Sequence, residues 1–499
     1  MPDRNQQFLL PPSISEWLAE DHLVWFVLDV VSIVDTAGFD ARHPNDGVGR
    51  PAYDPEMMLA LLVYGYCRGI RSSRRIAAAC RTDLAFRVIC VDLVPSNVAI
   101  ARFRVDHQTA IEQVFVDVLG LCGRAGLARL GTIAIDGTKI GSDAALDANR
   151  SESAIRSEVA RIMVEARAAD DADTAQPTLD GELPADLARR GSRRARLEQA
   201  AAQIEAEQAA RRAAAEEHAA NAAAEAVEGR RLRGRKPSDP HAALQRAETD
   251  LLAARTKAAS TRGNKSSARA AEAVARAEVA LAAARQTAEN APPPPEPQAN
   301  TTDPESRMMK TPSGWVQGYN AQAAVNDNQV VIAASVTQQR NDVNQLVPMM
   351  EAVAAQAAAA GIDGEIGTIL ADAGYWSDNN ATVEGPDRLI ATLKDWKQRK
   401  AARELGTTSG DPPPDAKPLD AMEHRLRTPE GAAAYARRSC TVEPVFGQTK
   451  ENRGIRRLTR RGLAAAQSEW SLICATSNIL KLHTHAQGRT LATTIAPHP

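Results

Sequence analysis

The stretch that decides the fold is Gly131-Thr132-Ile133-Ala134-Ile135-Asp136-Gly137-Thr138-Lys139-Ile140. Its run of β-branched residues predicts a short buried strand that ends at Asp136. An acid in that place lies at the carboxyl end of a strand, where open α/β sheets bind their ligands. Asp-Gly is also a strong hairpin signal, so the stretch by itself leaves a turn aspartate equally open.

A second stretch has the same form and favours a ligand site. It reads Glu365-Ile366-Gly367-Thr368-Ile369-Leu370-Ala371-Asp372-Ala373-Gly374-Tyr375, again a short apolar strand followed by an aspartate. A third carboxylate, Glu443, stands in Val442-Glu443-Pro444-Val445-Phe446-Gly447. Carboxylate oxygens are hard ligands, which suit Mg²⁺ or Mn²⁺. The sequence therefore predicts that Asp136, Asp372 and Glu443 share one divalent-metal site.

Several short motifs occur in a characteristic order along the chain. They are Ile135-Asp136-Gly137-Thr138, Asp303-Pro304-Glu305-Ser306-Arg307, Gly318-Tyr319-Asn320-Ala321-Gln322, Asp372-Ala373-Gly374-Tyr375 and Tyr435-x2-Arg438-x4-Glu443-x6-Lys450. In this combination the chain resembles the DDE transposases of bacterial insertion sequences, most closely the insertion sequence 1182 family. One departure is visible, because four residues separate Arg438 from Glu443 where the family signature usually has three.

The resemblance implies a ribonuclease-H-like catalytic domain and a chemistry for the three acids. Asp136, Asp372 and Glu443 would be the catalytic residues. They would hold two Mg²⁺ or Mn²⁺ ions, which activate the attacking oxygen and stabilise the leaving one. Water would first free a 3′-hydroxyl at each end of the element, and that hydroxyl would then attack target DNA.

The same resemblance implies double-stranded DNA as the partner, at the terminal inverted repeats and at the target. The protein would act as a homodimer on DNA, in the bacterial cytoplasm and associated with the nucleoid. Lys139, Tyr435, Arg438 and Lys450 would contact DNA phosphates. From the residues alone, Tyr435 and Arg438 remain open to a second interpretation, in which they only pack and pair.

Length and composition set the frame for these motifs. A chain of 499 residues exceeds one ordinary core, and about three units are expected. The net charge of −2 conceals basic clusters around residues 68–81, 230–236 and 453–461, so partners have to be inferred locally. Six cysteines without ligand spacing predict reduced thiols rather than a zinc site. The sequence predicts neither a signal peptide nor a membrane span, and a cytosolic protein is expected.

The first 127 residues predict an all-α domain. Helices are expected within 13–39, from Asp54-Pro55-Glu56 to Gly69, from Ser72 or Ser73 onward, and from Pro95-Ser96-Asn97 to Gly123. Four arginines surround the glycine turn at residue 69: Arg68, Arg71, Arg74 and Arg75. A helix-turn-helix-like DNA reader needs such phosphate contacts. A solvated corner of a helical bundle fits the spacing equally well, and it is the family resemblance that favours DNA.

A second arginine run follows Glu443. It includes Arg453, Arg456 and Arg457, and it predicts contact with an anionic substrate next to the acids. A solvated helix face is the alternative. Thr441 is expected to cap the helix that carries Glu443. Because Glu443 and Lys450 are seven residues apart, a regular helix would place them on one face.

The middle of the chain has a different composition from the rest. Residues from about 150 to 290 are rich in Ala, Glu, Arg and Gln and almost free of aromatics, which predicts long helices with little core. A Pro-rich linker at 292–297 follows. Strand patterns return at residue 315 and predict a β-hairpin over 315–337 whose two strands both pair beside 131–136. Further strands are expected before Asp372 and at 388–393.

We therefore predict an α/β protein with a mixed five-stranded sheet. The expected parts are a helical DNA-binding domain (1–127), the first part of a ribonuclease-H-like domain (128–149), a helical insertion with its linker (150–300), the remainder of the catalytic domain (301–485) and a flexible tail (486–499). The function predicted is that of a transposase. The alternatives are a nuclease of the same fold without strand transfer, an inactive DNA-binding relic, and a coiled-coil assembly protein.

Overall fold

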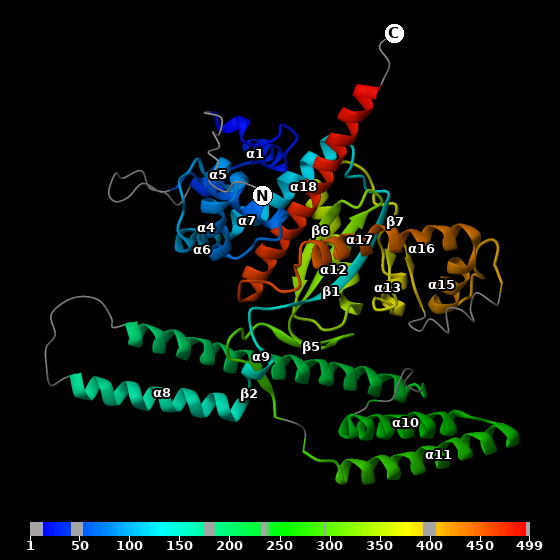
Figure 1. Ribbon diagram of the computed structural model, residues 1–499. Helices are drawn as coiled ribbons and strands as arrows, with labels where there is room; N and C mark the ends of the chain where they lie inside the picture. The colour runs from blue at the N-terminus through cyan, green and yellow to red at the C-terminus, as the bar shows by residue number, and fades with distance from the viewer. Residues whose placement is uncertain are drawn as a thin grey trace, which may run out of the picture. The chain divides into compact units, whose positions relative to one another are not determined.

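A mixed sheet of six strands lies at the centre of the structure, a computed structural model that describes residues 13–40, 53–173, 185–230, 237, 239–293, 296–392 and 406–495 (Figure 1). The strand order is β4-β5-β1-β7-β8, and β6 also pairs with β5. The strands are β1 (Thr132–Gly141), β4 (Arg307–Thr311), β5 (Gly314–Asn326), β6 (Val331–Thr337), β7 (Thr368–Ala371) and β8 (Asp387–Ile390). β1 runs antiparallel to β5 and parallel to β7, and β7 runs parallel to β8.

The hairpin predicted over 315–337 is present as β5 and β6, but only β5 lies beside β1. β6 pairs on the far edge of β5, next to β4, which is a strand that we did not predict. A strand has two edges, and β1 uses its second edge for the parallel partner β7. β1 therefore has no free edge for β6. The unpredicted strand β4 makes the sheet six-stranded instead of five-stranded.

Strand β1 is longer than the sequence predicted. It continues to Gly141, so Asp136 lies inside the strand and not at its end. The reason is β5, whose 13 residues stay paired with β1 as far as Gly318. The parallel pairing with β7 stops at Ile135. Asp136 thus lies just past the end of the parallel pairing with β7, while the antiparallel pairing with β5 continues beyond it. The alternative of a turn aspartate is excluded.

The N-terminal helices follow the predicted starts closely. They are α1 (Leu23–Ile33), α2 (Ala37–Asp40), α3 (Pro55–Cys67), α4 (Ser73–Thr82), α5 (Leu84–Cys90), α6 (Asn97–Asp106) and α7 (Gln108–Arg124), after a short 3₁₀ turn at Ile14–Glu16. The side chain of Asp54 caps α3, since it accepts hydrogen bonds from the amides of Glu56 and Met57. The single helix expected from Asn97 to Gly123 is divided at His107 into α6 and α7.

These helices do not form a core of their own, although the sequence predicts a separate domain over residues 1–127. They share one hydrophobic core with the sheet and with the C-terminal helix α18 (Leu463–Ile495), and they belong to one compact unit, residues 1–148 and 305–499. Helix α3 shows why: it is buried from Met57 to Cys67. A helix that is apolar on every side needs neighbours on every side, and α3 packs against α1, α5 and α18.

The remaining helices of this unit flank the sheet. They are α12 (Leu346–Ala359), α13 (Asp378–Thr382), α15 (Pro418–Arg427), α16 (Pro429–Thr441), α17 (Glu443–Gly447) and α18, with 3₁₀ turns at Leu146–Ala148 and Val343–Gln345 and one π-helical turn at Gln448–Asn452. Val442, and not Thr441, precedes α17. Residues 486–495 continue α18, where the sequence predicted a tail.

Side chains from two helices close the outer edge of β6. The amides of Val331 and Val336 donate to Asn478 (2.8 Å) and Gln467 (2.7 Å) of α18. The amide of Ala334 donates to Gln356 of α12 at 3.3 Å. An edge strand with open backbone groups can pair with another chain, and these bonds remove that possibility. They also tie α12 and α18 to the sheet.

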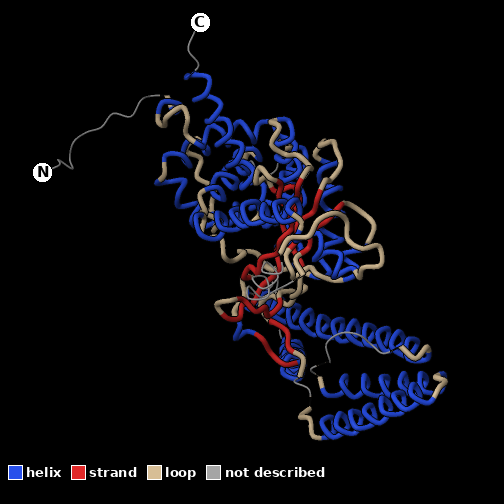
Figure 2. The backbone as a smooth tube through the Cα atoms, turned by 90° about the vertical axis from the view of Figure 1, so that its right-hand side faces the viewer, coloured by secondary structure: helices blue, strands red, loops and turns tan. Residues whose placement is uncertain are grey.

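Residues 149–304 form the second compact unit. It contains α8 (Glu152–Asp173), α9 (Ala185–Val227), α10 (Pro240–Ser260) and α11 (Asn264–Glu289), and Figure 2 shows it as almost entirely helical. Its apolar cluster is small: Ile155, Ile162, Leu197, Ala200, Ile204 and Ala299. The chain enters and leaves through a two-stranded ribbon, β2 (Asn149–Ser151) with β3 (Gln298–Asn300), in which Asn149 pairs with Asn300. The composition had predicted that antiparallel helices alone bring the two ends together.

Residues 231–236 of the basic stretch noted above, and residues 294–295 of the Pro-rich linker, lie outside the described part of the chain. Among the helices that are described, none is long and apolar enough to span a membrane.

The ribbon leads to a first prediction. Replacing residues 150–299 by a few Gly and Ser residues should leave the first unit folded, because paired residues of an antiparallel ribbon have Cα atoms only about 5 Å apart. The shortened protein should melt cooperatively in a thermal scan followed by circular dichroism, with the intact protein as the control. Loss of the cooperative transition would show that the second unit is part of the fold of the first.

Candidate active site

Asp136 and Asp372 lie side by side because of strand register. Ile135 of β1 pairs with Ala371 of β7, and the two aspartates are the next residues of the two parallel strands. Each carboxylate accepts a hydrogen bond from a nearby amide: Asp136 from Gly137 at 2.9 Å, and Asp372 from Gly374 at 2.8 Å. Both carboxylates therefore lie just beyond the last paired residues of β1 and β7.

Arg438 of α16 connects Asp136 to the third predicted acid. One terminal nitrogen of Arg438 lies 2.7 Å from Asp136 Oδ2, and the other lies 3.5 Å from Glu443 Oε1. The Arg438 and Asp136 side chains are 13% and 18% exposed, whereas that of Glu443 is 58% exposed. Glu443 is therefore linked to Asp136 by its ion pair with Arg438.

Burial raises the pKa of Asp136 to about 6. The guanidinium of Arg438 opposes this rise, the carboxylate of Asp372 adds to it, the amide of Gly137 opposes it, and Asp342 adds to it. Burial likewise raises the pKa of the Tyr375 hydroxyl, again with Asp342, Asp136 and Asp372 adding to the rise. Burial is thus the main reason why the Asp136 carboxyl is harder to ionise than a free aspartate, and Arg438 offsets this effect only in part.

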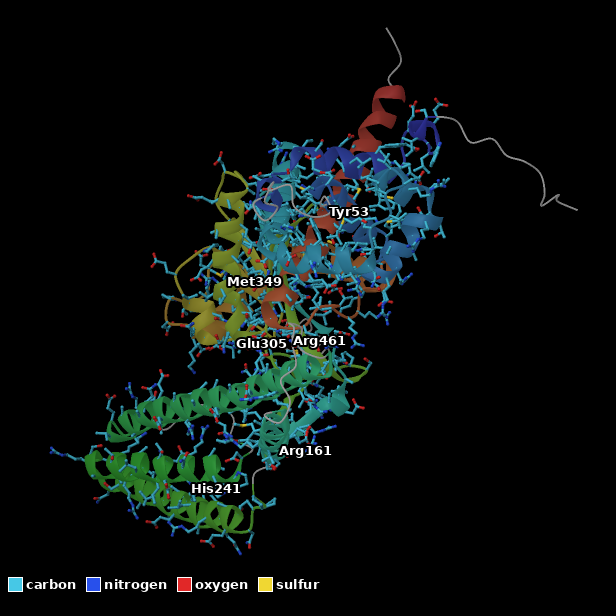
Figure 3. The ribbon with its side chains drawn as sticks, turned by 90° about the vertical axis from the view of Figure 1, so that its left-hand side faces the viewer. Tyr53, Arg161, His241, Glu305, Met349 and Arg461 are labelled. Atoms are coloured by element: carbon cyan, nitrogen blue, oxygen red, sulfur yellow. The ribbon has the colours of Figure 1, made fainter. Side chains whose placement is uncertain are left out.

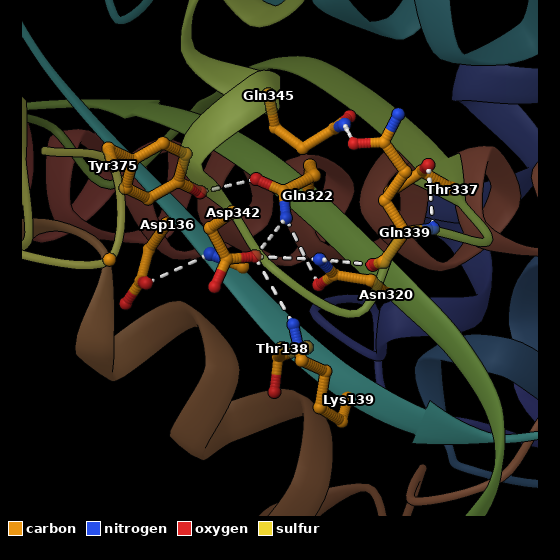
Figure 4. A network of polar contacts seen from close by, with 12 residues as sticks. Asp136, Thr138, Lys139, Asn320, Gln322, Thr337, Gln339, Asp342, Gln345 and Tyr375 are labelled. Atoms are coloured by element: carbon orange, nitrogen blue, oxygen red, sulfur yellow. Dashed lines mark hydrogen bonds and ion pairs between the residues drawn. The ribbon is translucent and has the colours of Figure 1, made fainter. Parts of the chain in front are cut away.

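Asp342 is a fourth acid of this site that the sequence did not single out (Figure 4). Its Oδ1 accepts hydrogen bonds from the side-chain amides of Asn320 (2.6 Å) and Gln322 (2.9 Å), and it pairs with Lys139 at 3.2 Å. Gln322 also accepts a hydrogen bond from the Tyr375 hydroxyl. The available signal was the motif Gly318-Tyr319-Asn320-Ala321-Gln322, because Asn320 and Gln322 are two residues apart and so lie on one face of β5.

Gly137 is required by this network. A Cβ atom at residue 137 would lie 2.2 Å from the Gln322 amide nitrogen and 2.6 Å from Asp342 Oδ1. Any other residue there would displace the side chains that hold Asp342. The Asp-Gly pair, which on sequence alone also fitted a turn, thus serves close packing inside a strand.

The two predicted lysines are occupied by contacts within the site. Lys139 pairs with Asp342, and Lys450 donates to the Thr138 hydroxyl and to the Lys139 carbonyl (3.3 Å). Burial lowers the pKa of Lys450. Glu443 begins α17, whereas Lys450 lies inside the π-helical turn at 448–452, so the two residues are not spaced as on the regular helix that we expected. Tyr435 packs partly buried against the main core.

The arginine runs divide into exposed and structural members. Arg68, Arg74 and Arg75 are exposed on the N-terminal helices. Arg71 is mostly buried and pairs with Glu469 at 3.0 Å, whereas Arg456 and Arg457 are exposed and pair with Glu451 and with Asp143 (3.1 Å) at the surface. Arg453 is buried and donates to Thr449, Thr476 and Ser477, so it holds the loop that follows the π-helical turn at 448–452 and does not face solvent. At the end of this run, the labelled Arg461 and Glu305 lie near the start of α18, whose Leu463 amide donates to Glu305 (Figure 3).

Comparison with known families adds an independent observation. Residues 12–106 match the family described as a transposase domain, and residues 397–483 match the family described as a transposase DDE domain. Together the two matches support a DDE transposase family. No curated protein and no solved structure matches the chain. The narrower resemblance to the insertion sequence 1182 family stays a prediction.

For a DDE transposase the donor set is chemically suitable. Asp136, Asp342, Asp372 and Glu443 offer only carboxylate oxygens, which suit Mg²⁺ or Mn²⁺. Among the residues that the structure describes, however, no three His, Cys, Asp or Glu side chains are grouped so that they could hold a metal ion. The predicted common group of three acids is absent from this arrangement because Arg438 stands between Asp136 and Glu443.

The raised pKa of Asp136 predicts how stability depends on pH without divalent metal. An unfolded aspartate titrates near pH 4, so between about pH 4 and 6 the folded protein keeps a proton that the unfolded chain has lost. The contribution of Asp136 to the free energy of unfolding therefore falls as the pH rises from about 4 to 6. Asp136→Asn, which cannot ionise, should be more stable than the wild type at pH 7 by about 1–3 kcal/mol, and the difference should vanish below about pH 4. Urea unfolding in EDTA across this pH range measures it.

Asp342→Asn serves as the companion variant. Removing the charge of Asp342 takes away one of the causes that raise the pKa of Asp136. The loss of stability should still begin near the pKa of an unfolded aspartate, but it should end at a lower pH and be smaller than in the wild type. If the stability of both variants depends on pH in the same way as that of the wild type, Asp136 is not the titrating group.

Proposed function

We propose that the protein is a transposase that binds the ends of an insertion sequence, hydrolyses phosphodiester bonds there and joins the 3′-hydroxyl ends to target DNA. The observation that carries the proposal is the pairing of Ile135 with Ala371, which sets Asp136 and Asp372 next to each other, with Arg438 reaching from Asp136 to Glu443. The two family matches support the same function.

The sheet supports a ribonuclease-H-like catalytic domain. A long antiparallel hairpin lies on one side of β1, two short parallel strands lie on the other side, and the acids are at the central pair. We infer that Asp136, Asp372 and Glu443 are the metal ligands of this domain. Two bound Mg²⁺ or Mn²⁺ ions would supply activation of the attacking oxygen and stabilisation of the leaving one.

Arg438 has a defined part in this proposal. In the structure it balances Asp136 and approaches Glu443, so these carboxylates are released for metal binding only when the guanidinium moves away. A displaced Arg438 is then available for a DNA phosphate, which is the role that the family resemblance implies. Lys450, held against Thr138 and Lys139, keeps a second positive charge beside the acids. Lys139 is the next residue of β1 after Thr138, so its side chain points to the other face of the sheet, where it pairs with Asp342.

The test is cleavage of a duplex that carries one end of the element's flanking inverted repeats. Asp136→Asn, Asp372→Asn and Glu443→Gln should each abolish Mg²⁺-dependent cleavage while leaving DNA binding in a gel-shift assay largely unchanged, because the change removes a metal ligand and not a phosphate contact. Asp378→Asn, at an exposed position of α13, is the matched control and should cleave normally.

The products separate the proposed function from its alternatives. Transfer of a labelled 3′ end to a second duplex identifies a transposase, whereas cleavage without transfer identifies a nuclease of the same fold. Full cleavage by any one of the three acid variants would refute the assigned site. A wild-type protein that binds the ends and never cleaves would identify a relic.

A further inference from the structure

An open pocket of about 530 Å³ lies where the start of α4, helix α6 and the loop 453–462 meet. Four arginines line it: Arg71 and Arg74 at the start of α4, Arg104 on α6, and Arg457 in the loop. Ser72 and Asp143 are among the other lining residues. We call this site the arginine pocket. The sequence predicted the two arginine runs separately, and nothing in their spacing indicated that they share a site.

A close backbone contact brings the two runs together. Gly69 has φ of +71°, and a Cβ atom there would lie 2.3 Å from the Arg453 carbonyl oxygen. Glu469 of α18 fixes the same junction, because it accepts hydrogen bonds from Arg71, from Tyr66 and from the hydroxyl and amide of Thr459. Both walls of the pocket are therefore held in place.

The pocket contains more positive charge than its carboxylates balance. Glu469 is used by Arg71, and Asp143 is shared by Arg457 and Arg461. Arg104 is only 8% exposed, and its terminal nitrogens donate to neutral oxygens: the Tyr66 hydroxyl, the Arg71 carbonyl, Thr459 and Ser73. Its Nε has no hydrogen-bond partner within the described residues. A buried cation without an anion is costly, so this site favours a negatively charged ligand.

The start of α4 points to the same ligand. The helix spans ten residues, its first turn carries no acid, and Arg74 and Arg75 stand there instead. The side chain of Ser72, in the capping position, makes no capping hydrogen bond. Positive side chains at a helix start oppose the helix dipole, whereas an anion there is stabilised by the dipole and by the first amides.

We propose that the arginine pocket binds a phosphate of the DNA backbone, contacted by Arg74, Arg104 and Arg457. This inference rests on the proposed function, and it adds a site that neither family match assigns. The N-terminal helices and the loop after Lys450 both contribute to the pocket. One bound phosphate therefore engages the helical part and the part that carries Glu443 at the same time.

The test uses the full-length protein and a short fluorescein-labelled duplex, with binding followed by fluorescence anisotropy over a range of salt concentrations. Arg74→Gln and Arg457→Gln should each weaken binding and lower the slope of log affinity against log salt by about 0.9 for each DNA phosphate that the variant no longer neutralises. Arg81→Gln is the matched control, because Arg81 is exposed at the other end of α4, and its slope should equal that of the wild type. Thermal melting of each variant checks that the fold is retained.

A second arm separates DNA from free phosphate. Millimolar inorganic phosphate is added to the wild type and to the double variant Arg74→Gln/Arg457→Gln, and the melting temperature is measured. A lower DNA salt slope in the pocket variants supports the proposal. Unchanged slopes overturn it, and if phosphate then raises the melting temperature of the wild type alone, the pocket takes free phosphate. If the wild type binds no duplex at all, the proposed function fails as well, whereas binding and cleavage with unchanged slopes refute the pocket only.

Discussion

The pairing of β1 with two partners of unequal length is the constraint on which the site depends. β5 stays hydrogen-bonded to β1 as far as residue 141, so the strand is held straight beyond Asp136. β7 stops four residues into its pairing and leaves one edge of β1 open from Asp136 onward. A buried polar side chain needs partners for its hydrogen bonds and its charge, and the end of the β1–β7 pairing leaves room for such partners beside Asp136. That opening is where Asp136, Asp372 and Arg438 meet.

Charge balance then determines the arrangement of the side chains. Burial of several carboxylates is costly unless cations and amides compensate, and the structure supplies Arg438 for Asp136 and Lys139 for Asp342. Asn320 and Gln322 add neutral donors to Asp342. Burial nevertheless leaves the pKa of Asp136 raised, because Arg438 offsets the loss of hydration only in part. In the structure the guanidinium of Arg438 is the cation that compensates the buried Asp136 carboxylate.

The N-terminal helices belong to this architecture and are not an appendage. Their apolar residues continue the core of the sheet and of α18, and the buried Glu469 joins Tyr66 and Arg71 to Thr459. Because a buried carboxylate loses much of its stabilisation when one partner is removed, this junction resists separation of its two sides. The arginine pocket lies across this junction, so its two walls are fixed relative to each other.

The sequence alone determined the two strands that contain or precede Asp136 and Asp372, the cap at Asp54, the hairpin over 315–337 and the change of composition that marks the second unit. These are local properties, since strand pattern, capping and helix propensity depend on neighbours in the chain. The tertiary structure alone decided the extension of β1 to Gly141, the entry of Asp342, the position of Arg438 between two acids, and the shared core of the N-terminal helices. Each of these depends on a partner far away in sequence, such as β5 for β1, Asn320 for Asp342 and α18 for α3. A pattern within a single segment carries no information about which distant segment will supply its hydrogen bonds, its counter-charge or its packing surface.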